Sequence, residues 1–257
     1  MIPLRDENPT SRPAIVTLAI IGACLVAYLL WQPTPFSSTT EDVIFFERRA
    51  AIPDEVVDRR PLDLQEVADD YGAQSLPVIC VISPSATNLQ ASDPCVPDKR
   101  VWLAVVVSMF LHGSIVHIAG NLLFLWVFGN NVEDRLGSIA FTLFYLVGGV
   151  VATLAHVAVD PSSTVPVVGA SGAIAAVMGA YLVWYPGAQV QTLFFVFFIF
   201  WFRIPAAMLL GVWFVLQFFT SPNSGVAWVA HVAGFIFGVI VGLLVGRPRR
   251  PAPAYYI

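Results

Sequence analysis

The sequence predicts an all-α, polytopic membrane protein built as a bundle of six transmembrane helices. Of its 257 residues, 57% are hydrophobic and only 12% are charged, whereas a soluble domain carries about 25% charged residues. The apolar residues also gather in long runs, which lipid would cover more readily than a water-soluble core. The net charge of -4 is modest, and we expect no nucleic-acid partner.

The first helix is predicted at residues 14–31, after a short polar N-terminus at residues 1–13. The run 14–31 contains no charged residue and exceeds the apolar part of a signal peptide, which is about 7–15 residues. It ends in Tyr-Leu-Leu-Trp-Gln-Pro instead of a small-x-small cleavage site. We therefore interpret it as a transmembrane helix with Trp31 at its far end.

Residues 32–113 are predicted to form one long extracytoplasmic loop, here called L1. Within it, Val43–Phe46 and Ile52–Val57 could lie on the membrane surface as short amphipathic pieces. Val101–Leu111 is apolar but too short to span a bilayer. We expect that segment to dip into the interface, with Trp102 at the level of the headgroups.

Residues 114–246 contain the five remaining predicted helices, and residues 247–257 form a tail. The first of the five is expected to end at a water-facing turn, Glu133-Asp134-Arg135. The apolar segments that define them are Ser114–Asn131, Ile139–Val159, Ser171–Tyr185, the aromatic region Gln189–Phe219 that Arg203 interrupts, and Val226–Val245.

The distribution of basic residues predicts the orientation. Seven of the thirteen Lys and Arg residues lie in the terminal segments and in the turns at 132–137 and 203. The other six lie in L1, whose length weakens their influence, and the loops 160–170 and 220–226 contain none. The positive-inside rule therefore places both termini in the cytoplasm and L1 outside the plasma or inner cell membrane.

Two of the three cysteines lie in L1. Cys80 and Cys95 are fifteen positions apart, and an oxidising compartment would favour a disulfide between them. The alternative is a pair of free thiols. Cys24 lies in the first apolar run and is interpreted as a packing residue, and no zinc-binding spacing of cysteines is present.

Polar side chains inside the predicted spans are costly and are therefore candidates for function. No Asp, Glu or Lys lies deep in a span, which argues against an ion-coupled transporter, an aspartyl protease and a zinc protease. We accordingly predict no metal and no cofactor. Nucleophile chemistry remains, and the polar candidates are His112, His117, Asn121, His156, Ser171 and His231.

Ser171 is the candidate nucleophile, in the sequence Gly169-Ala-Ser171-Gly172 at the start of the fourth predicted helix. A serine there can simply cap the helix. The flanking Gly169 and Gly172, however, leave room for a substrate backbone to approach. A serine nucleophile also needs a base.

His231 is the candidate base, near the outer end of the last span. His231, Gly234 and Gly238 share one helical stripe, as do Ser171, Ala175 and Gly179. Stripes of small residues let two membrane helices pack closely, which would bring the hydroxyl and the imidazole to the same level. The alternative is an interfacial histidine bonded to a carbonyl group.

His117 and Asn121 are the candidate donors for an oxyanion. They are four residues apart and so share one face of the second predicted helix. Both can donate hydrogen bonds, and the alternative is that they join two helices by hydrogen bonds.

Taken together, these motifs resemble the rhomboid intramembrane serine proteases. The resemblance covers roughly residues 100–245, the first helix and the opening MIPLRDENP. Many members of that family carry Trp-Arg where this chain has Leu103-Ala104. The motifs are His112-Gly-Ser-Ile-Val-His117-Ile-Ala-Gly-Asn121, Gly129-x-x-x-Glu133-x-x-x-Gly137, Gly169-Ala-Ser171-Gly172 and Ala230-His231-x-x-Gly234.

The resemblance implies one rhomboid domain over residues 14–246, with a catalytic bundle at 114–246 and a Ser171–His231 dyad without a third acid. The oxyanion would be bound by the Ser171 N–H, His117 and Asn121. His112 would support the outer loop, and Gly234 and Gly238 would allow close helix packing. The fifth helix and the 220–226 loop would form the gate for the substrate.

The partners implied are the lipid bilayer and single-span membrane proteins whose helices unwind easily and carry a small residue before the cut. The oligomeric state is left open. We expect a neutral imidazole base and a loss of activity at low pH. The competing hypothesis is a non-catalytic binder or chaperone of membrane proteins built on the same bundle.

Overall fold

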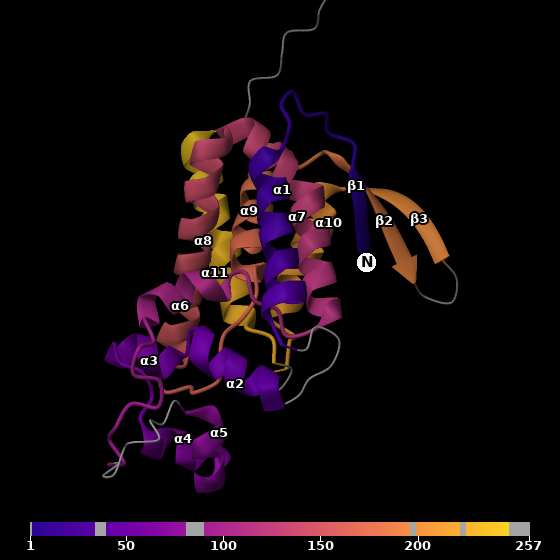
Figure 1. Cartoon of the computed structure of the whole chain (residues 1–257). Coiled ribbons are helices and arrows are strands. Elements are labelled where there is room, and N and C mark those ends of the chain that lie inside the picture. Colours follow the sequence, from indigo (N-terminus) through magenta and orange to yellow (C-terminus); the bar gives the residue numbers. More distant parts are fainter. Residues whose placement is uncertain (1, 34–39, 81–89, 196–198, 222–224, 247–257) are drawn as a thin grey trace, which may run out of the picture.

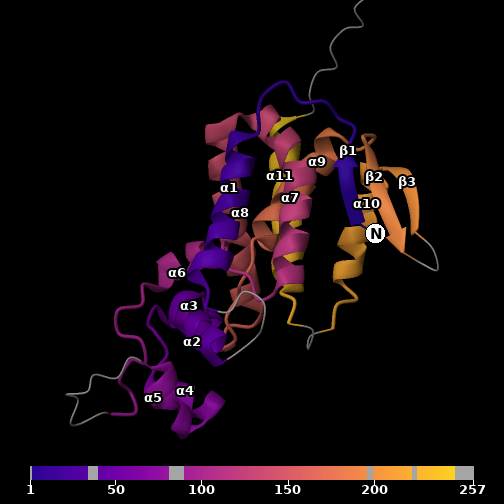
Figure 2. The same ribbon diagram turned by 45° about the vertical axis from the view of Figure 1, so that its right-hand side comes forward.

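The computed structural model describes residues 2–33, 40–80, 90–195, 199–221 and 225–246. The chain is mostly helical, as predicted. Apolar helices stand side by side in a bundle, the helices of L1 gather at one end of it, and a small sheet lies along one side (Figures 1 and 2). The predicted tail at 247–257 lies outside the described residues.

Among the described residues, three helices are long and apolar enough to cross a membrane, and three apolar helices are shorter. The first shorter helix, Ile15–Trp31, consists of α1 (Ile15–Val26) and a terminal π-helical turn, Ala27–Trp31. The long helices are α7 (Ile115–Leu136), α8 (Ser138–Val159) and α11 (Trp228–Val245), and the other short ones are α9 (Ser171–Trp184) and α10 (Ala206–Gln217).

Helix α9 lies at the centre of the bundle. It contacts α11, α8, α7 and α10, and nearly all of its side chains are buried. Its sequence is rich in Ala and Gly, which let neighbouring backbones approach closely. The large residues of α9, such as Met178 and Tyr181, are fully buried in the main core. The short helix that carries Ser171 is therefore enclosed by protein.

The predicted water-facing turn at Glu133 is wrong. Helix α7 continues to Leu136 and ends at Gly137, whose φ of 78° favours glycine. Glu133 is buried, and its carboxylate accepts hydrogen bonds from the Val16 and Thr17 N–H groups at 2.9 and 2.8 Å. These N–H groups lie in the first turn of α1 and have no partner within that helix. Glu133 thus ties α7 to the start of α1.

The first part of the predicted aromatic region, residues 189–205, forms two antiparallel strands and not a helix. Its last part forms the helix α10, as predicted. A small sheet is thus added to the helical bundle. Strands β1 (Ile2–Asp6), β2 (Gln189–Phe195) and β3 (Ile199–Pro205) form one antiparallel sheet in the order β1-β2-β3. The hairpin is rich in aromatic and β-branched residues, which favour strands. Hydrophobic periodicity alone does not separate such an apolar run from a buried helix.

The N-terminal strand is anchored in the bundle by a buried carboxylate. Asp6 Oδ2 accepts hydrogen bonds from the Tyr181 hydroxyl at 2.6 Å and from Asn131 Nδ2 at 2.7 Å. Asn131 Oδ1 accepts a further bond from Asn8 Nδ2 at 2.6 Å. The polar N-terminus, predicted only as a short cytoplasmic segment, is therefore joined to α7 and α9.

L1 forms a small helical unit with its own core at one end of the bundle (Figure 1). Cys80 and Cys95 are joined by a disulfide with a Cα–Cα distance of 4.6 Å, and both pack in this core. The helices of L1 are α2 (Thr40–Arg49), α3 (Pro53–Asp58), α4 (Leu64–Tyr71), α5 (Leu76–Ile79) and α6 (Val101–Ser108), with a 3-10 turn at Ala73–Ser75.

L1 also buries a cluster of charged groups. Lys99 Nζ lies 2.6 Å from Glu55 Oε2 and donates to the Glu47 carbonyl at 2.6 Å. The Glu47 carboxylate accepts from the Tyr71 hydroxyl at 2.7 Å. Burial raises the pKa of Glu47 to about 7, although Tyr71 and Lys99 act in the opposite direction. Glu47 therefore titrates close to neutrality in the folded chain.

We predict that L1 becomes less stable as the pH rises. Because the pKa of Glu47 is higher in the folded chain than its ordinary value of 4.5, the folded state holds this proton more tightly. The contribution of Glu47 to the free energy of unfolding is therefore complete below pH 4.5 and is lost as the pH rises through about 7. The loss should be on the order of 3 kcal/mol, measured by hydrogen exchange of α2 and α4 corrected for intrinsic rates.

Glu47→Gln should abolish most of this pH dependence, because the amide mimics the protonated carboxyl. Glu41→Gln is the matched control, since Glu41 lies on the same helix but is exposed. Equal pH profiles for the wild type and Glu47→Gln would contradict the prediction.

Candidate active site

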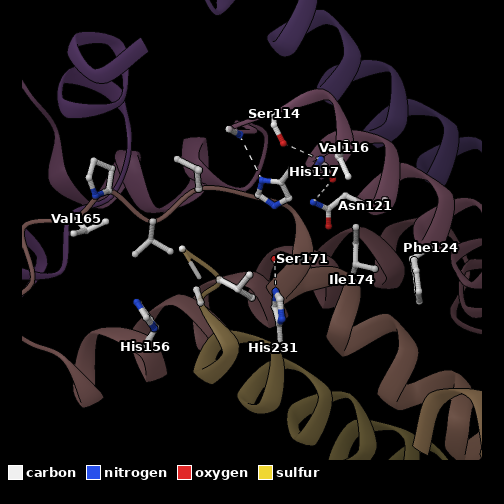
Figure 3. Close-up of a pocket in the computed structure, with 18 of the residues that line it drawn as sticks. Ser114, Val116, His117, Asn121, Phe124, His156, Val165, Ser171, Ile174 and His231 are labelled. Carbon is white, nitrogen blue, oxygen red and sulfur yellow. Dashed lines mark hydrogen bonds between the residues drawn. The ribbon is translucent and has the colours of Figure 1, made fainter. Parts of the chain in front are cut away.

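Ser171 is the first residue of α9, and its hydroxyl does not cap the helix. The residue in the capping position is Ala170, and no side chain accepts a capping hydrogen bond there. The Ser171 hydroxyl instead lies 2.8 Å from His231 Nε2 on α11. The interpretation of Ser171 as a simple helix cap is therefore wrong, and the predicted meeting of the two side chains is observed (Figure 3).

This meeting depends on the close approach of α9 and α11. A Cβ atom added at Gly234 would collide with the Gly172 carbonyl, and one added at Gly238 would collide with the Ala176 carbonyl. On the other helix, a Cβ atom at Gly179 would collide with the Phe235 carbonyl. Only glycine at these positions permits backbones this close, so the predicted small-residue stripes do face each other.

His117 and Asn121 lie on the opposite side of Ser171 from His231 (Figure 3). His117 Nδ1 accepts a hydrogen bond from the Gly113 N–H at 3.4 Å, so in a neutral ring Nε2 carries the hydrogen. Asn121 Nδ2 uses one of its two hydrogens on the His117 carbonyl at 3.1 Å. Each side chain can therefore present an N–H group to the space beside Ser171.

The absence of a side chain at Gly169 leaves space for the His117 ring. Its φ is 126°, and a Cβ atom there would lie 2.8 Å from His117 Nε2. The N–H of Gly169 donates to the Ser108 carbonyl at 2.9 Å, while the Ser108 hydroxyl accepts from the Ala51 N–H at 2.7 Å. Ala51 in turn accepts from the Val167 N–H at 2.8 Å. L1 thus holds the loop that leads into Ser171.

These side chains share one cavity of about 710 Å³. It is lined by residues from α7, α8, α9, α10 and α11 and by the 160–170 loop. Within the part of the chain that the structure describes, no group of three His, Cys, Asp or Glu side chains could hold a metal ion. The polar lining side chains include Ser114, His117, Asn121, His156, Asp160, Ser163, Ser171 and His231.

His112 does not line this cavity. Its side chain is fully buried and packs edge-on against His117, with 5.2 Å between ring centroids. Its backbone N–H donates to Gln32 Oε1 at 3.0 Å, and its carbonyl accepts from Gln32 Nε2 at 2.8 Å. His112 therefore joins the end of the first helix to the segment before α7.

Sequence reasoning missed Gln217 and gave no role to His156. His231 Nδ1 lies 2.8 Å from Gln217 Oε1 on α10, and His156 lines the same cavity from α8. Gln217 could have been selected from the sequence because its amide ends an otherwise apolar helix, and polar groups inside a membrane are functional candidates. Nothing in the sequence pattern indicated that it faces His231.

We predict that Gly238→Ala separates α9 from α11. The added methyl group must displace the Ala176 carbonyl, which should cost about 2 kcal/mol or more of stability. Thermal unfolding in detergent micelles measures this loss. Gly211→Ala on α10 is the control, since no atom lies within 4 Å of its added Cβ. Equal melting temperatures for the two variants would show that the close approach is not required.

Comparison with known proteins identifies the family. A family model described as Rhomboid domain matches residues 99–248, which is more than half of the chain. Rhomboid protease GluP of Bacillus subtilis (strain 168) is 30% identical over 151 residues, covering 59% of this chain and 27% of that protein. Rhomboid-related protein 2 of Mus musculus is 31% identical over 160 residues, covering 58% and 50%.

A third relative comes from an organelle. RHOMBOID-like protein 12, mitochondrial, of Arabidopsis thaliana is 32% identical over 165 residues, covering 56% of this chain and 47% of that protein. The chain thus spans half or less of the length of each of these relatives. The family match and the apolar helical bundle agree, and the chain belongs to the rhomboid family of membrane proteins.

Proposed function

We propose that this chain is an intramembrane serine endopeptidase that uses Ser171 as nucleophile and His231 as base. The observation that carries the proposal is the 2.8 Å contact between the Ser171 hydroxyl and His231 Nε2. A nucleophile and a base within hydrogen-bond distance are the signature of covalent catalysis. Their shared cavity, with N–H donors on the far side of Ser171, supports the same reading.

The mechanism follows from this placement. The Ser171 hydroxyl gives its proton to His231 Nε2 as its oxygen attacks the peptide carbonyl. The negative charge that develops on the carbonyl oxygen is met by the Ser171 N–H at the start of α9, by His117 and by Asn121. His231 then donates the proton to the departing amine, leaving an acyl-enzyme.

Water completes the cycle. A water molecule attacks the acyl group while His231 accepts its proton, and the proton returns to Ser171 as the carboxyl product leaves. The polar lining of the cavity, which includes Asp160 and Ser163 of the 160–170 loop, provides hydrogen-bond partners for that water. His112 supports His117 from behind by ring packing, which keeps the donor face in place.

The proposed substrates are single-span membrane proteins that reach the cavity from the bilayer. Trp213 of α10 and residues 225–227 line the cavity beside His231, so a displacement of α10 would widen it on this side. A substrate must unwind to present an extended backbone to Ser171, because backbone groups in a helix are already paired. Helices containing Gly or Pro unwind at the lowest cost, because these residues have the lowest helix propensities.

We predict that purified protein in detergent or liposomes cleaves a model single-span substrate, and that Ser171→Ala and His231→Ala each abolish the cleavage. The loss should be at least about 1,000-fold in each case, because either change removes a member of the same reacting pair. Gel analysis and mass spectrometry of the fragments measure it. Ser92→Ala is the matched control, since Ser92 is exposed in L1.

Equal product from the wild type and both variants would contradict the protease proposal. If neither the wild type nor the variants cleave the substrate but all three proteins retain it in a pull-down, the result favours the competing hypothesis of a non-catalytic membrane-protein binder.

We further propose that both termini are cytoplasmic and that L1 and the cavity face the outside of the cell membrane. The sequence distribution of Lys and Arg supports this orientation, and the Cys80–Cys95 disulfide fits an oxidising compartment. Asp70→Cys, on an exposed part of α4, should react with an impermeant maleimide in intact cells. Thr10→Cys should react only after permeabilisation, and the reverse pattern would overturn the proposal.

A further inference from the structure

We propose that Gln217 is a positioning residue for His231, holding the imidazole in the one neutral tautomer that can accept the proton of Ser171. The inference rests on the proposed function. It adds a third member, carried by α10, to the pair on α9 and α11.

Its hydrogen bonds fix the orientation of the Gln217 amide. Gln217 Nε2 lies 2.9 Å from the Trp213 carbonyl, one turn earlier in the same helix. A carbonyl oxygen can only accept, so the amide nitrogen must occupy this side. The other end of the amide, Oε1, then faces His231 Nδ1 at 2.8 Å. The two contacts together exclude the flipped amide.

The contact with Gln217 also determines the tautomer of His231. Since Oε1 can only accept, Nδ1 must carry a hydrogen to form this bond. A neutral imidazole has one N–H group, so Nε2 is left with a lone pair. That lone pair faces the Ser171 hydroxyl at 2.8 Å. The opposite tautomer would place a hydrogen on Nε2 and could not accept the serine proton.

Two side chains of α10, Trp213 and Gln217, orient the His231 ring. The Trp213 ring lies beside the imidazole at 5.8 Å between centroids, with a tilt of 37°. Gln217 is buried, so water does not readily replace its hydrogen bond. Trp213 thus limits the movement of the His231 ring on one side, and the hydrogen bond to Gln217 limits its rotation. Both groups come from α10, so a displacement of that helix would release the base.

Gln217 differs from the carboxylate of a Ser-His-Asp triad because it orients the ring without carrying charge. The titratable side chains that act on His231 electrostatically are His117 on α7 and His156 on α8. Among the described residues that line the cavity, Asp160 is the one acidic side chain. The tautomer is therefore set by a neutral amide, and a variant that adds charge there should alter the pH profile.

The test compares Gln217→Leu and Gln217→Glu with the wild type in the cleavage assay. Gln217→Leu should lower kcat by roughly 10- to 100-fold with little change in KM, because only the orientation of the base is lost. Gln217→Glu keeps an acceptor and should restore most of kcat, with the acid limb of the pH–rate profile moved to higher pH. Leu216→Ala, an exposed neighbour on α10, is the control.

A second measurement reads the tautomer without any substrate. In ¹⁵N-histidine-labelled protein, the His231 signals are those missing from the His231→Ala spectrum. They should show a protonated Nδ1 in the wild type and a mixture of tautomers in Gln217→Leu. Unchanged kcat and an unchanged tautomer in Gln217→Leu would overturn the proposal. A wild type that does not cleave would instead count against the proposed protease activity, and the spectrum would still report on Gln217.

Discussion

The backbone contact between α9 and α11 is the constraint on which the site depends. Three glycines, Gly179, Gly234 and Gly238, allow carbonyl groups of one helix to lie where a side chain of the other would otherwise be. In a membrane such contacts gain from dispersion and from close approach rather than from the hydrophobic effect. Because the helices are this close, Ser171 and His231 meet at 2.8 Å.

The remaining elements hold this pair in place from three directions. L1 contacts the 160–170 loop through Ser108 and Ala51, α7 supplies His117 and Asn121, and α10 supplies Gln217. At the other end of the bundle, hydrogen bonds of Glu133 join α7 to α1, and a hydrogen bond of Asp6 joins β1 to α9. The buried carboxylates of Glu133 and Asp6 are thus paired with groups on other elements, as a membrane environment favours.

The sequence predicted the features that local pattern controls. Ser171 and His231 were found as polar residues in apolar runs, and the facing glycine stripes and the shared face of His117 and Asn121 follow from helical periodicity. The errors arose where tertiary contacts decide. Glu133 is buried by α1, which is distant in the sequence, and the apolar hairpin at 189–205 is paired with the N-terminal strand. Gln217 faces His231 only because α10 packs against α11.

Labelling with a fluorophosphonate probe measures whether the His231 imidazole activates the Ser171 hydroxyl. We expect a covalent adduct that peptide mass spectrometry maps to Ser171 in the wild type, with none in Ser171→Ala and at most trace labelling in His231→Ala. Equal labelling of the wild type and His231→Ala, or an adduct on another serine, would contradict this expectation.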